Sequence, residues 1–192
     1  MKIEVNDISK TYDGKDVLID FNAVFEDGSK TVLTGRSGIG KTTLLHILAG
    51  LVRPDNGTVV LSGVTMNCGV VFQEDRLLEN LTAERNISLI RPAPEVAQIR
   101  ADLKELIPDI DMNAPVSTFS GGMKRRVAIV RACLSDSDIL IMDEPFTGLD
   151  DNARRDVLRY IEERRGGRTL IIASHITDGL EDYNRIEIPE TE

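Results

Sequence analysis

The chain has 192 residues, of which 41% are hydrophobic and 29% are charged, and its formal net charge is −9. This length and composition fit one folded domain with its own apolar core, and they exclude a disordered chain. The acidic balance argues against binding to a nucleic-acid backbone and against broad adsorption to anionic lipid, because both favour a basic surface. Arg125, Arg126 and Arg131 are basic and close together, but they fall on a helical pattern beside apolar positions.

The cysteines and the apolar runs indicate where the protein works. Cys68 and Cys133 are far apart and lack the spacing of metal ligands, so we expect two reduced, buried thiols in a reducing compartment. Residues 1–4 lack the apolar core of a signal peptide. No apolar run approaches the roughly 20 residues needed to cross a bilayer. We therefore expect a cytoplasmic protein that reaches a membrane only through a partner.

The first third of the chain is predicted to be mainly β. Loose alternation and β-branched residues predict strands at residues 2–9, 16–25, 30–34, 58–61 and 69–72. After the third of these strands, apolar side chains recur at the spacing of an amphipathic helix, namely Leu44, Ile47, Leu48 and Leu51. The segment 53–57, Arg-Pro-Asp-Asn-Gly, predicts the turn that ends this helix.

The middle of the chain is predicted to be helical. Helices are expected at residues 81–89 and 95–107, and no convincing strand lies between Gln73 and Phe119. We interpret residues 74–119 as a small helical subdomain, inserted into an α/β core formed by residues 1–73 and 120–192.

The last third returns to alternating strands and helices. A helix is expected after Ser120, another at 152–165 and a short one at 177–182. Strands are expected at 138–142, 169–173 and, at a sheet edge, 185–188. The run Ile-Leu-Ile-Met at 139–142 is typical of a parallel sheet covered on both faces. The predicted fold is an α/β core with a mostly parallel sheet, an N-terminal antiparallel β part and the helical insertion.

A glycine-rich segment matches a phosphate-binding loop at every fixed position of its pattern. Residues 35–42 read Gly-Arg-Ser-Gly-Ile-Gly-Lys-Thr, between a predicted strand and a predicted helix. Glycine lets backbone N–H groups turn toward an anion, and the helix N-terminus adds partial positive charge. Lys41 can reach the β- and γ-phosphates of a nucleotide, and the Thr42 hydroxyl is suited to Mg²⁺.

Two acids end the apolar strand before Pro145. Neighbouring residues on a strand face opposite ways, so Asp143 and Glu144 can serve different purposes. We interpret Asp143 as the Mg²⁺ partner, and Glu144 as the general base or the group that positions the attacking water. About 100 residues after a phosphate-binding loop, this pair predicts nucleotide hydrolysis, and so an α/β core of the P-loop NTPase class.

Further segments stand in a characteristic order around these two motifs. The order is Tyr12, the loop 35–42, Gln73, the segment 120–124 (Ser-Gly-Gly-Met-Lys), Asp143-Glu144, the segment 148–150 (Gly-Leu-Asp) and His175. From Tyr12 to His175, the chain resembles the ATP-binding cassette (ABC) family, the nucleotide-binding subunits of ABC transporters. The segment 71–78 (Val-Phe-Gln-Glu-Asp-Arg-Leu-Leu) is similar to that of the nitrate, sulfonate and taurine importer group.

The resemblance implies a role for each of these residues. It implies that Tyr12 stacks on adenine, that Gln73 touches Mg²⁺ and water and links the site to a membrane partner, and that His175 contacts the γ-phosphate. Ser120, Gly121 and Gly122 correspond to the signature motif, which contacts the γ-phosphate held by a second subunit, and Asp150 bridges the two sites. The expected catalytic residues are Glu144, His175, Lys41 and Gln73, and the expected metal ligands are Thr42, Gln73 and Asp143. The expected nucleotide-binding residues are Tyr12, Gly35, Arg36, Ser37, Gly38, Ile39, Gly40, Lys41, Thr42, Thr43, Ser120, Gly121, Gly122 and Asp150.

A second anion-binding helix terminus, at Ser120, has a physical consequence of its own. One ATP uses both this terminus and the loop only if they converge or if a second copy supplies one of them. A head-to-tail pair of chains with two ATP molecules between them satisfies this condition. Met123 departs from the family pattern, which has Gln there, and Met cannot replace the donors and acceptors of that amide.

Together these features predict an ATPase with ATP and Mg²⁺ as ligands. The expected function is the ATP-hydrolysing subunit of an ABC transporter, peripheral on the cytoplasmic face of the membrane. Its expected partners are a second copy of itself and transmembrane permease subunits, with a substrate-binding protein as a further candidate, and not nucleic acid. The alternatives are a non-transport ABC ATPase and a weakly hydrolysing, nucleotide-sensing subunit, the latter favoured only by Met123.

Overall fold

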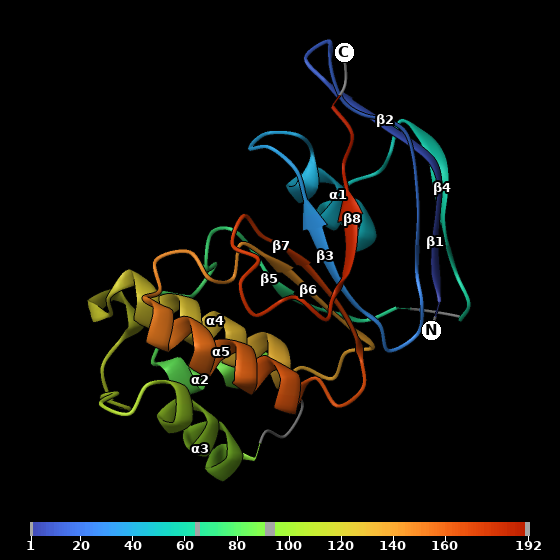
Figure 1. The fold of residues 1–192 in the computed structure, drawn as a ribbon. Coiled ribbons are helices and arrows are strands. Elements are labelled where there is room, and N and C mark those ends of the chain that lie inside the picture. Colours follow the sequence, from blue (N-terminus) through green and yellow to red (C-terminus); the bar gives the residue numbers. More distant parts are fainter. Residues whose placement is uncertain (1, 64–65, 91–94, 191–192) are drawn as a thin grey trace. The chain divides into compact units, whose positions relative to one another are not determined.

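The computed structural model describes residues 2–63, 66–90 and 95–190 (Figure 1). It divides into two compact units, each described by itself. The first holds Met1–Val70, Ser137–Glu144 and Gly167–Glu192, and the second holds Val71–Asp136 and Pro145–Gly166. None of the helices in the described part of the chain combines the length and the hydropathy needed to cross a bilayer.

The N-terminal strands of the first unit form an antiparallel sheet. Its order is β2 (Lys15–Phe25), β1 (Ile3–Tyr12) and β4 (Asn56–Leu61), with β1 antiparallel to both neighbours. The antiparallel part expected from the sequence is therefore confirmed. The strand predicted at residues 2–9 continues to Tyr12, because β1 pairs with β2 as far as the turn that joins them.

A second sheet carries the buried strands. Its order is β5 (Cys68–Val71), β6 (Ile139–Asp143), β7 (Thr169–Ala173), β3 (Lys30–Thr34) and β8 (Asn184–Glu187). Strand β7 runs parallel to β6 and β3, and β8 is the parallel edge strand beside β3. Every residue of β6 and β7 is buried, which explains their continuous apolar runs. The predicted α/β fold is confirmed.

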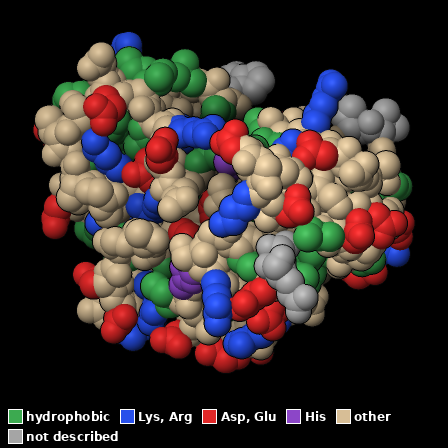
Figure 2. Space-filling model, turned by 90° about the horizontal axis from the view of Figure 1, so that it is seen from above, with side chains coloured by type: hydrophobic (Ala, Val, Ile, Leu, Met, Phe, Trp, Pro, Cys, Tyr) green, Lys and Arg blue, Asp and Glu red, His purple; other side chains and the backbone are tan. Residues whose placement is uncertain are grey.

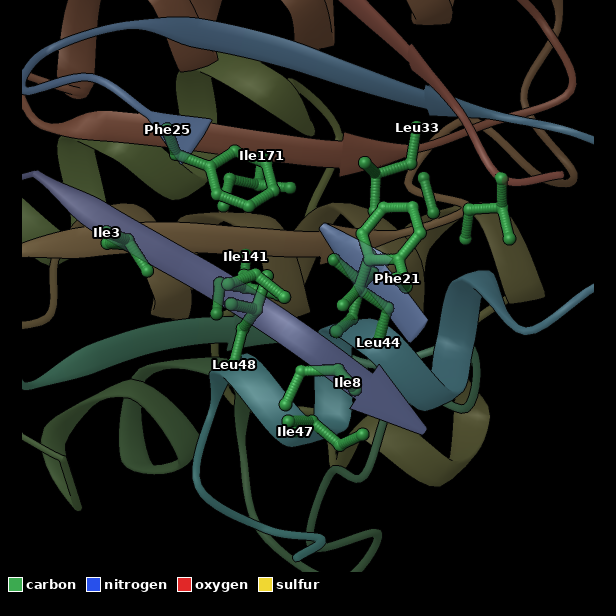
Figure 3. Packing of buried hydrophobic residues seen from close by; sticks show 14 of the residues in the cluster. Ile3, Ile8, Phe21, Phe25, Leu33, Leu44, Ile47, Leu48, Ile141 and Ile171 are labelled. Atoms are coloured by element: carbon green, nitrogen blue, oxygen red, sulfur yellow. The ribbon is translucent and has the colours of Figure 1, made fainter. Parts of the chain in front are cut away.

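The core of the first unit lies between helix α1 (Lys41–Leu48) and the two sheets. Figure 3 shows Leu44, Ile47 and Leu48 of α1 beside side chains of β1, β2, β6 and β7. These three side chains are at most 5% exposed. The predicted continuation of the helix to Leu51 is wrong. Gly50 adopts a left-handed φ of 70°, the Leu51 N–H bonds back to His46, and the Leu51 side chain is 55% exposed.

The helices of the second unit pack against one another. They are α2 (Ala83–Ser88), α3 (Val96–Leu106), α4 (Gly121–Cys133) and α5 (Asp151–Arg164), which Figure 1 labels. The 3₁₀ turn η1 (Val116–Thr118) lies between α3 and α4 in the sequence. The side chains of Thr82, Ser120 and Asp150 cap α2, α4 and α5, and these caps set where the helices begin. The second unit is larger than the predicted insertion of residues 74–119, because α4 and α5 pack with α3. The division at 74–119 stays a prediction.

One predicted helix is absent from the described structure. Residues 177–182 form successive turns rather than the short helix expected there. The Leu180 N–H donates to the Thr177 carbonyl, and Gly179 adopts a φ of 83°. A residue in the left-handed region interrupts the right-handed helical path, so the turn is not propagated.

Candidate nucleotide-binding site

The loop of residues 35–42 joins β3 to α1 and depends on glycine at its bends. Gly35, Gly38 and Gly40 all have positive φ, of 137°, 77° and 113°. At Gly40 a Cβ atom would lie 2.8 Å from the Val17 carbonyl oxygen, closer than packed atoms approach. Within the ranges that the structure describes, no side chain caps the N-terminus of α1 at Gly40. The loop therefore presents backbone N–H groups and a helix N-terminus, which is the arrangement that binds phosphate.

The Lys41 ammonium lies within this loop. Its Nζ donates to the carbonyl oxygens of Gly35 at 2.7 Å and Arg36 at 3.1 Å, and the residue is only 6% exposed. Within the described part of the chain, its hydrogen-bond partners are these neutral carbonyls and not a carboxylate. A buried charge that lacks a counter-charge is costly, so the site is suited to an anionic ligand.

The first acid of the predicted pair meets the loop. Thr42 Oγ1 donates to Asp143 Oδ2 at 2.7 Å, and Asp143 is 3% exposed. A hydroxyl and a carboxylate oxygen side by side are the hard oxygen donors that Mg²⁺ prefers. Mg²⁺ usually takes one or two protein oxygens, and phosphates and waters supply the rest. The two residues therefore fit a magnesium ion bound together with a nucleotide.

Glu144 and His175 form a second pair at the ends of β6 and β7. Glu144 Oε1 lies 3.2 Å from His175 Nε2, and Glu144 Oε2 accepts a 3.3 Å hydrogen bond from the His175 backbone N–H. The Oε1 contact has ion-pair distance but lacks hydrogen-bond geometry, since Oε1 is buried without a hydrogen-bond partner among the described residues. Glu144 also adopts a φ of 49°, an uncommon backbone conformation for a residue other than glycine. Such strain is concentrated at functional sites.

Ser174 fixes the backbone that carries His175. It is 2% exposed, and its hydroxyl donates to the Ile176 carbonyl at 2.8 Å and accepts from the Ile176 N–H at 3.0 Å. The tight turn leaves the His175 side chain half-exposed. The imidazole is therefore held near Glu144 by its backbone while one face stays open to solvent.

Tyr12 ends strand β1 with an accessible ring. Its side chain is 44% exposed, and the Lys10 ammonium lies 5.3 Å from the ring centroid. In the same unit, residues 15–17 and 36–39 line a depression of about 220 Å³. A partly exposed aromatic ring can stack on a base, and this role of Tyr12 stays a prediction. Thr43 and His46, further along α1, are half-buried.

In the second unit, the signature residues line a larger hollow of about 620 Å³. Ser120, Gly121, Gly122 and Asp150 all border it. Ser120 Oγ accepts the Met123 N–H at 3.2 Å as the cap of α4, so its own hydroxyl hydrogen remains available to a ligand. Asp150 caps α5 by accepting the Ala153 N–H at 2.8 Å. These four residues thus converge on one surface.

The Gln73 segment is held through its backbone while the Gln73 side chain is exposed. The Arg125 guanidinium of α4 donates to the carbonyl oxygens of Phe72 and Gln73. Arg131 donates to those of Asp75 and Arg76. The sequence shows these two arginines only as basic residues on a helical pattern beside apolar positions. That position is itself a signal, because a buried arginine must find acceptors.

The residues predicted from the sequence thus fall into two groups. The first unit holds Tyr12, Gly35, Arg36, Ser37, Gly38, Ile39, Gly40, Lys41, Thr42, Thr43, Asp143, Glu144 and His175. The second unit holds Gln73, Ser120, Gly121, Gly122 and Asp150. In the first group the structure brings Thr42 to Asp143, and Glu144 to His175. In the second it gathers the signature residues and Asp150.

One face of the protein shows acidic and basic side chains interspersed with hydrophobic ones (Figure 2).

The arginines of α4 donate hydrogen bonds to backbone carbonyls of the second unit. Besides the bonds from Arg125 and Arg131, Arg126 donates to the carbonyls of Gly122 at 3.1 Å and Leu106 at 2.7 Å. The basic residues that the sequence places close together therefore stabilise the second unit.

The fold and the loop define a P-loop nucleotide-binding protein, and comparison with known proteins gives its family. The family model described as ABC transporter matches residues 18–147. The chain belongs to the ABC transporter family, as an ABC ATPase domain.

Three similar proteins illustrate this relationship. The uncharacterized ABC transporter ATP-binding protein YcbN of Bacillus subtilis is 32% identical over 93% of this chain and 63% of its own length. The sulfate/thiosulfate import ATP-binding protein CysA of Ralstonia nicotianae is 34% identical over 84% of this chain and 48% of its own length. A solved ATP-binding subunit of an ABC transporter has a TM-score of 0.83 at 27% identity, covering 98% of this chain and 86% of that one. The chain thus spans about half to two thirds of the length of the two sequence relatives.

Proposed function

We propose that this chain binds ATP, hydrolyses it to ADP and phosphate, and so energises the transport of a solute through separate membrane subunits. The observation that carries the proposal is the combination within one unit of Lys41, the Thr42–Asp143 hydrogen bond and the Glu144–His175 contact. The first two features suit binding of a metal-bound triphosphate. The third suits hydrolysis, because it supplies a carboxylate beside a second polar group.

The chemistry follows from the placement of these side chains. Loop N–H groups and the Lys41 ammonium bind the β- and γ-phosphates. Glu144 orients a water molecule and accepts its proton as the water oxygen attacks the γ-phosphorus and the bond to the bridging β–γ oxygen breaks. His175 donates a hydrogen bond to the γ-phosphate. ADP and inorganic phosphate leave. Positioning and fixed charge supply most of the rate enhancement in reactions of this type.

Mg²⁺ fits the site as a second ligand. Thr42 and Asp143 would hold it through oxygen atoms, and Gln73 is proposed as a further ligand. When bound, the ion offsets the charge that develops on the phosphate oxygens. The protein's own part is to fix the direction of the two oxygens. The 2.7 Å hydrogen bond between Thr42 Oγ1 and Asp143 Oδ2 achieves this.

We propose that the complete site forms between two copies arranged head to tail. Ser120 and the glycines after it lie at the N-terminus of α4, a helix of 13 residues. That terminus, with a free Ser120 hydroxyl hydrogen, suits the γ-phosphate of an ATP held by the other copy. Asp150 would then bridge the two sites. Two ATP molecules would be buried at a symmetric interface.

The proposed setting is the cytoplasmic face of the membrane. The name of one sequence relative describes an ABC transporter ATP-binding protein, and the name of the other describes a sulfate/thiosulfate import ATP-binding protein. Membrane permease subunits are accordingly the proposed partners, with Gln73 on the surface that responds to them. The proposal covers transport but names neither a solute nor a direction, because other subunits would select the solute.

The experiment for this proposal has two arms. Phosphate release is measured with the purified chain, ATP and Mg²⁺, and the native complex is isolated through a tag on this chain. The expected result is magnesium-dependent hydrolysis, together with membrane subunits in the complex. A complex free of membrane subunits would indicate a non-transport ABC ATPase. ATP binding that leads to no measurable turnover would favour the nucleotide-sensing alternative, in which Met123 weakens the signature.

A further inference from the structure

Residues 72–76 run along helix α4 and are bonded to it by two arginine side chains. Arg125 Nη1 donates to the Phe72 carbonyl at 2.6 Å, and its Nη2 donates to the Gln73 carbonyl. Arg131 donates to the Arg76 carbonyl at 2.8 Å and the Asp75 carbonyl at 3.0 Å. The segment lacks regular secondary structure, so these bonds satisfy carbonyls that a helix or sheet would otherwise engage.

Arg125 has a second kind of contact with the same segment. Its Nε lies 3.2 Å from Asp75 Oδ1, an ion pair in which Oδ1 is buried and lacks hydrogen-bond geometry. Arg125 itself is 6% exposed. The guanidinium stays charged, and its planar group holds several N–H donors in fixed directions. It therefore contacts three groups of this one segment, namely two backbone carbonyls and one carboxylate.

The far end of the segment is anchored independently. Asn86 of α2, 2% exposed, accepts the Leu78 N–H at 2.7 Å and donates to the Leu78 carbonyl at 3.1 Å. The backbone from Phe72 to Leu78 is therefore held at both ends. The Gln73 side chain nevertheless points to solvent, since Gln73 is exposed. An exposed side chain on a fixed backbone can be aimed at a ligand with little loss of conformational entropy.

Arg125 also lies on the helix that carries the signature residues. Ser120 caps α4, and Arg125 follows within the second turn of the same helix. Both border the hollow that the signature residues line. A rigid helix thus carries, close together, a group proposed to contact a γ-phosphate and the group that holds the Gln73 backbone.

We propose that Arg125 is a positioning residue, which fixes the Gln73 backbone on α4 and so couples the Gln73 side chain to the signature motif. This proposal rests on the function proposed above for Gln73 and Ser120. Arg125 acts through Gln73 and does not itself contact ATP. Asp75 supports it through the ion pair with the guanidinium Nε.

The test is the variant Arg125→Gln, examined in the purified full chain. We expect kcat for ATP hydrolysis to fall by roughly tenfold to a hundredfold, which is the usual effect of removing a residue that orients a metal ligand. The Mg²⁺ concentration needed for half-maximal activity should rise. The KM for ATP should change by less than about twofold, because the phosphate loop is untouched. Arg125→Lys should restore part of kcat, since a single ammonium keeps the charge but cannot bridge the same acceptors.

Limited proteolysis with trypsin gives a readout that is independent of activity, because Arg76 lies in the segment and is exposed. Cleavage after Arg76 should be faster in Arg125→Gln than in the parent chain, because the bonds from Arg125 to the backbone carbonyls no longer oppose local opening of the segment. If the parent chain does not hydrolyse ATP, the proposed function fails, and the proteolysis result alone decides whether Arg125 holds the segment. If Arg125→Gln does not fold, Arg125→Lys and Asp75→Asn are compared with the parent in both assays.

Arg164→Gln is the matched control. Arg164 of α5 is also an ion-paired arginine of the second unit, with Nε 2.6 Å from the buried Asp102, but its carboxylate partners, Asp102 and Glu105, lie outside residues 72–76. It should lower the melting temperature and leave kcat and the rate of tryptic cleavage after Arg76 unchanged. The proposal is overturned if Arg125→Gln reduces kcat no more than Arg164→Gln at equal stability, or if the rate of cleavage after Arg76 is unaltered in Arg125→Gln.

Discussion

The hydroxyl of Thr42 donates a 2.7 Å hydrogen bond to the carboxylate of Asp143, although 101 positions separate them in the sequence. Thr42 lies in the first turn of α1, directly after the loop that follows β3, and Asp143 ends β6. Strand β7 lies between β3 and β6 and is parallel to both. Since the carboxyl ends of parallel strands meet at one edge of a sheet, the loop and the carboxylate converge there.

Replacement of Lys41 by alanine tests the phosphate site. The change should weaken ATP binding by at least about tenfold, because the ammonium supplies charge-assisted hydrogen bonds to phosphate. Fold stability should change little, since among the described residues the buried ammonium is bonded to the neutral carbonyls of Gly35 and Arg36 alone. Titration calorimetry with ATP and thermal unfolding without ATP measure the two effects. An affinity within about twofold of the parent would contradict the assignment.

Replacement of Glu144 by glutamine separates binding from hydrolysis. Loss of a general base should lower turnover by about a hundredfold or more, whereas ATP binding and ATP-driven dimerisation should remain. Phosphate release and gel filtration with ATP measure these two properties. Asp156→Asn, an exposed acid on α5 in a 3.4 Å pair with Arg159, is the surface control. Steady-state turnover unchanged from the parent would remove Glu144 from its role.

Replacement of Gly40 by alanine tests the shape of the loop. The new Cβ would lie 2.8 Å from the Val17 carbonyl oxygen, at a φ of 113° that alanine rarely adopts. We expect a loss of about 1–3 kcal/mol in the free energy of unfolding and weaker ATP binding. Gly38→Ala is the matched control, because Gly38 has a φ of 77° but a Cβ added there would meet no atom of the described residues within 4 Å. If Gly40→Ala and Gly38→Ala lost the same stability, backbone strain alone would explain the loss, and the contact with Val17 would contribute nothing.

Replacement of Asp102 by alanine tests the packing of α3 on α5. Asp102 is fully buried and accepts hydrogen bonds from Gln98 and Arg164, each at 2.6 Å. Removing it leaves both donors without this acceptor and should lower the free energy of unfolding by about 3 kcal/mol. Urea unfolding measures the loss, and Asp156→Ala serves as the exposed control. A change within about 0.5 kcal/mol would contradict a stabilising role.

Cys68 predicts a dependence of stability on alkaline pH. Burial, with a smaller contribution from the Asp138 charge, raises the pKa of the Cys68 thiol from 9.0 to about 11. The folded state therefore retains a proton that the unfolded chain releases above pH 9. The resulting stability is present below pH 9 and is lost as pH rises toward 11. Unfolding curves of the parent and of Cys68→Ala should differ in slope between these values, and parallel curves would contradict the prediction.

Local sequence patterns were enough for the features that depend on neighbouring residues. The glycine spacing of residues 35–42 and the apolar runs of β6 and β7 are such patterns, and each specifies its own backbone conformation. They were sufficient to predict the α/β fold and the order of the motifs. Local pattern failed at Leu51 and at residues 177–182, where Gly50 and Gly179 take left-handed conformations that end or interrupt the helical path.

Tertiary packing was needed to establish which distant groups meet. The Thr42–Asp143 bond, the Glu144–His175 contact and the hold of Arg125 on the Gln73 backbone each join segments dozens of residues apart. The sequence alone does not identify the partner of a charged side chain, because the partner depends on which acceptors are buried beside that side chain in the folded protein. Burial is a property of the packed chain. The sequence therefore shows Arg125 only as a basic residue on a helical pattern, and the tertiary structure shows that it donates to the Gln73 carbonyl.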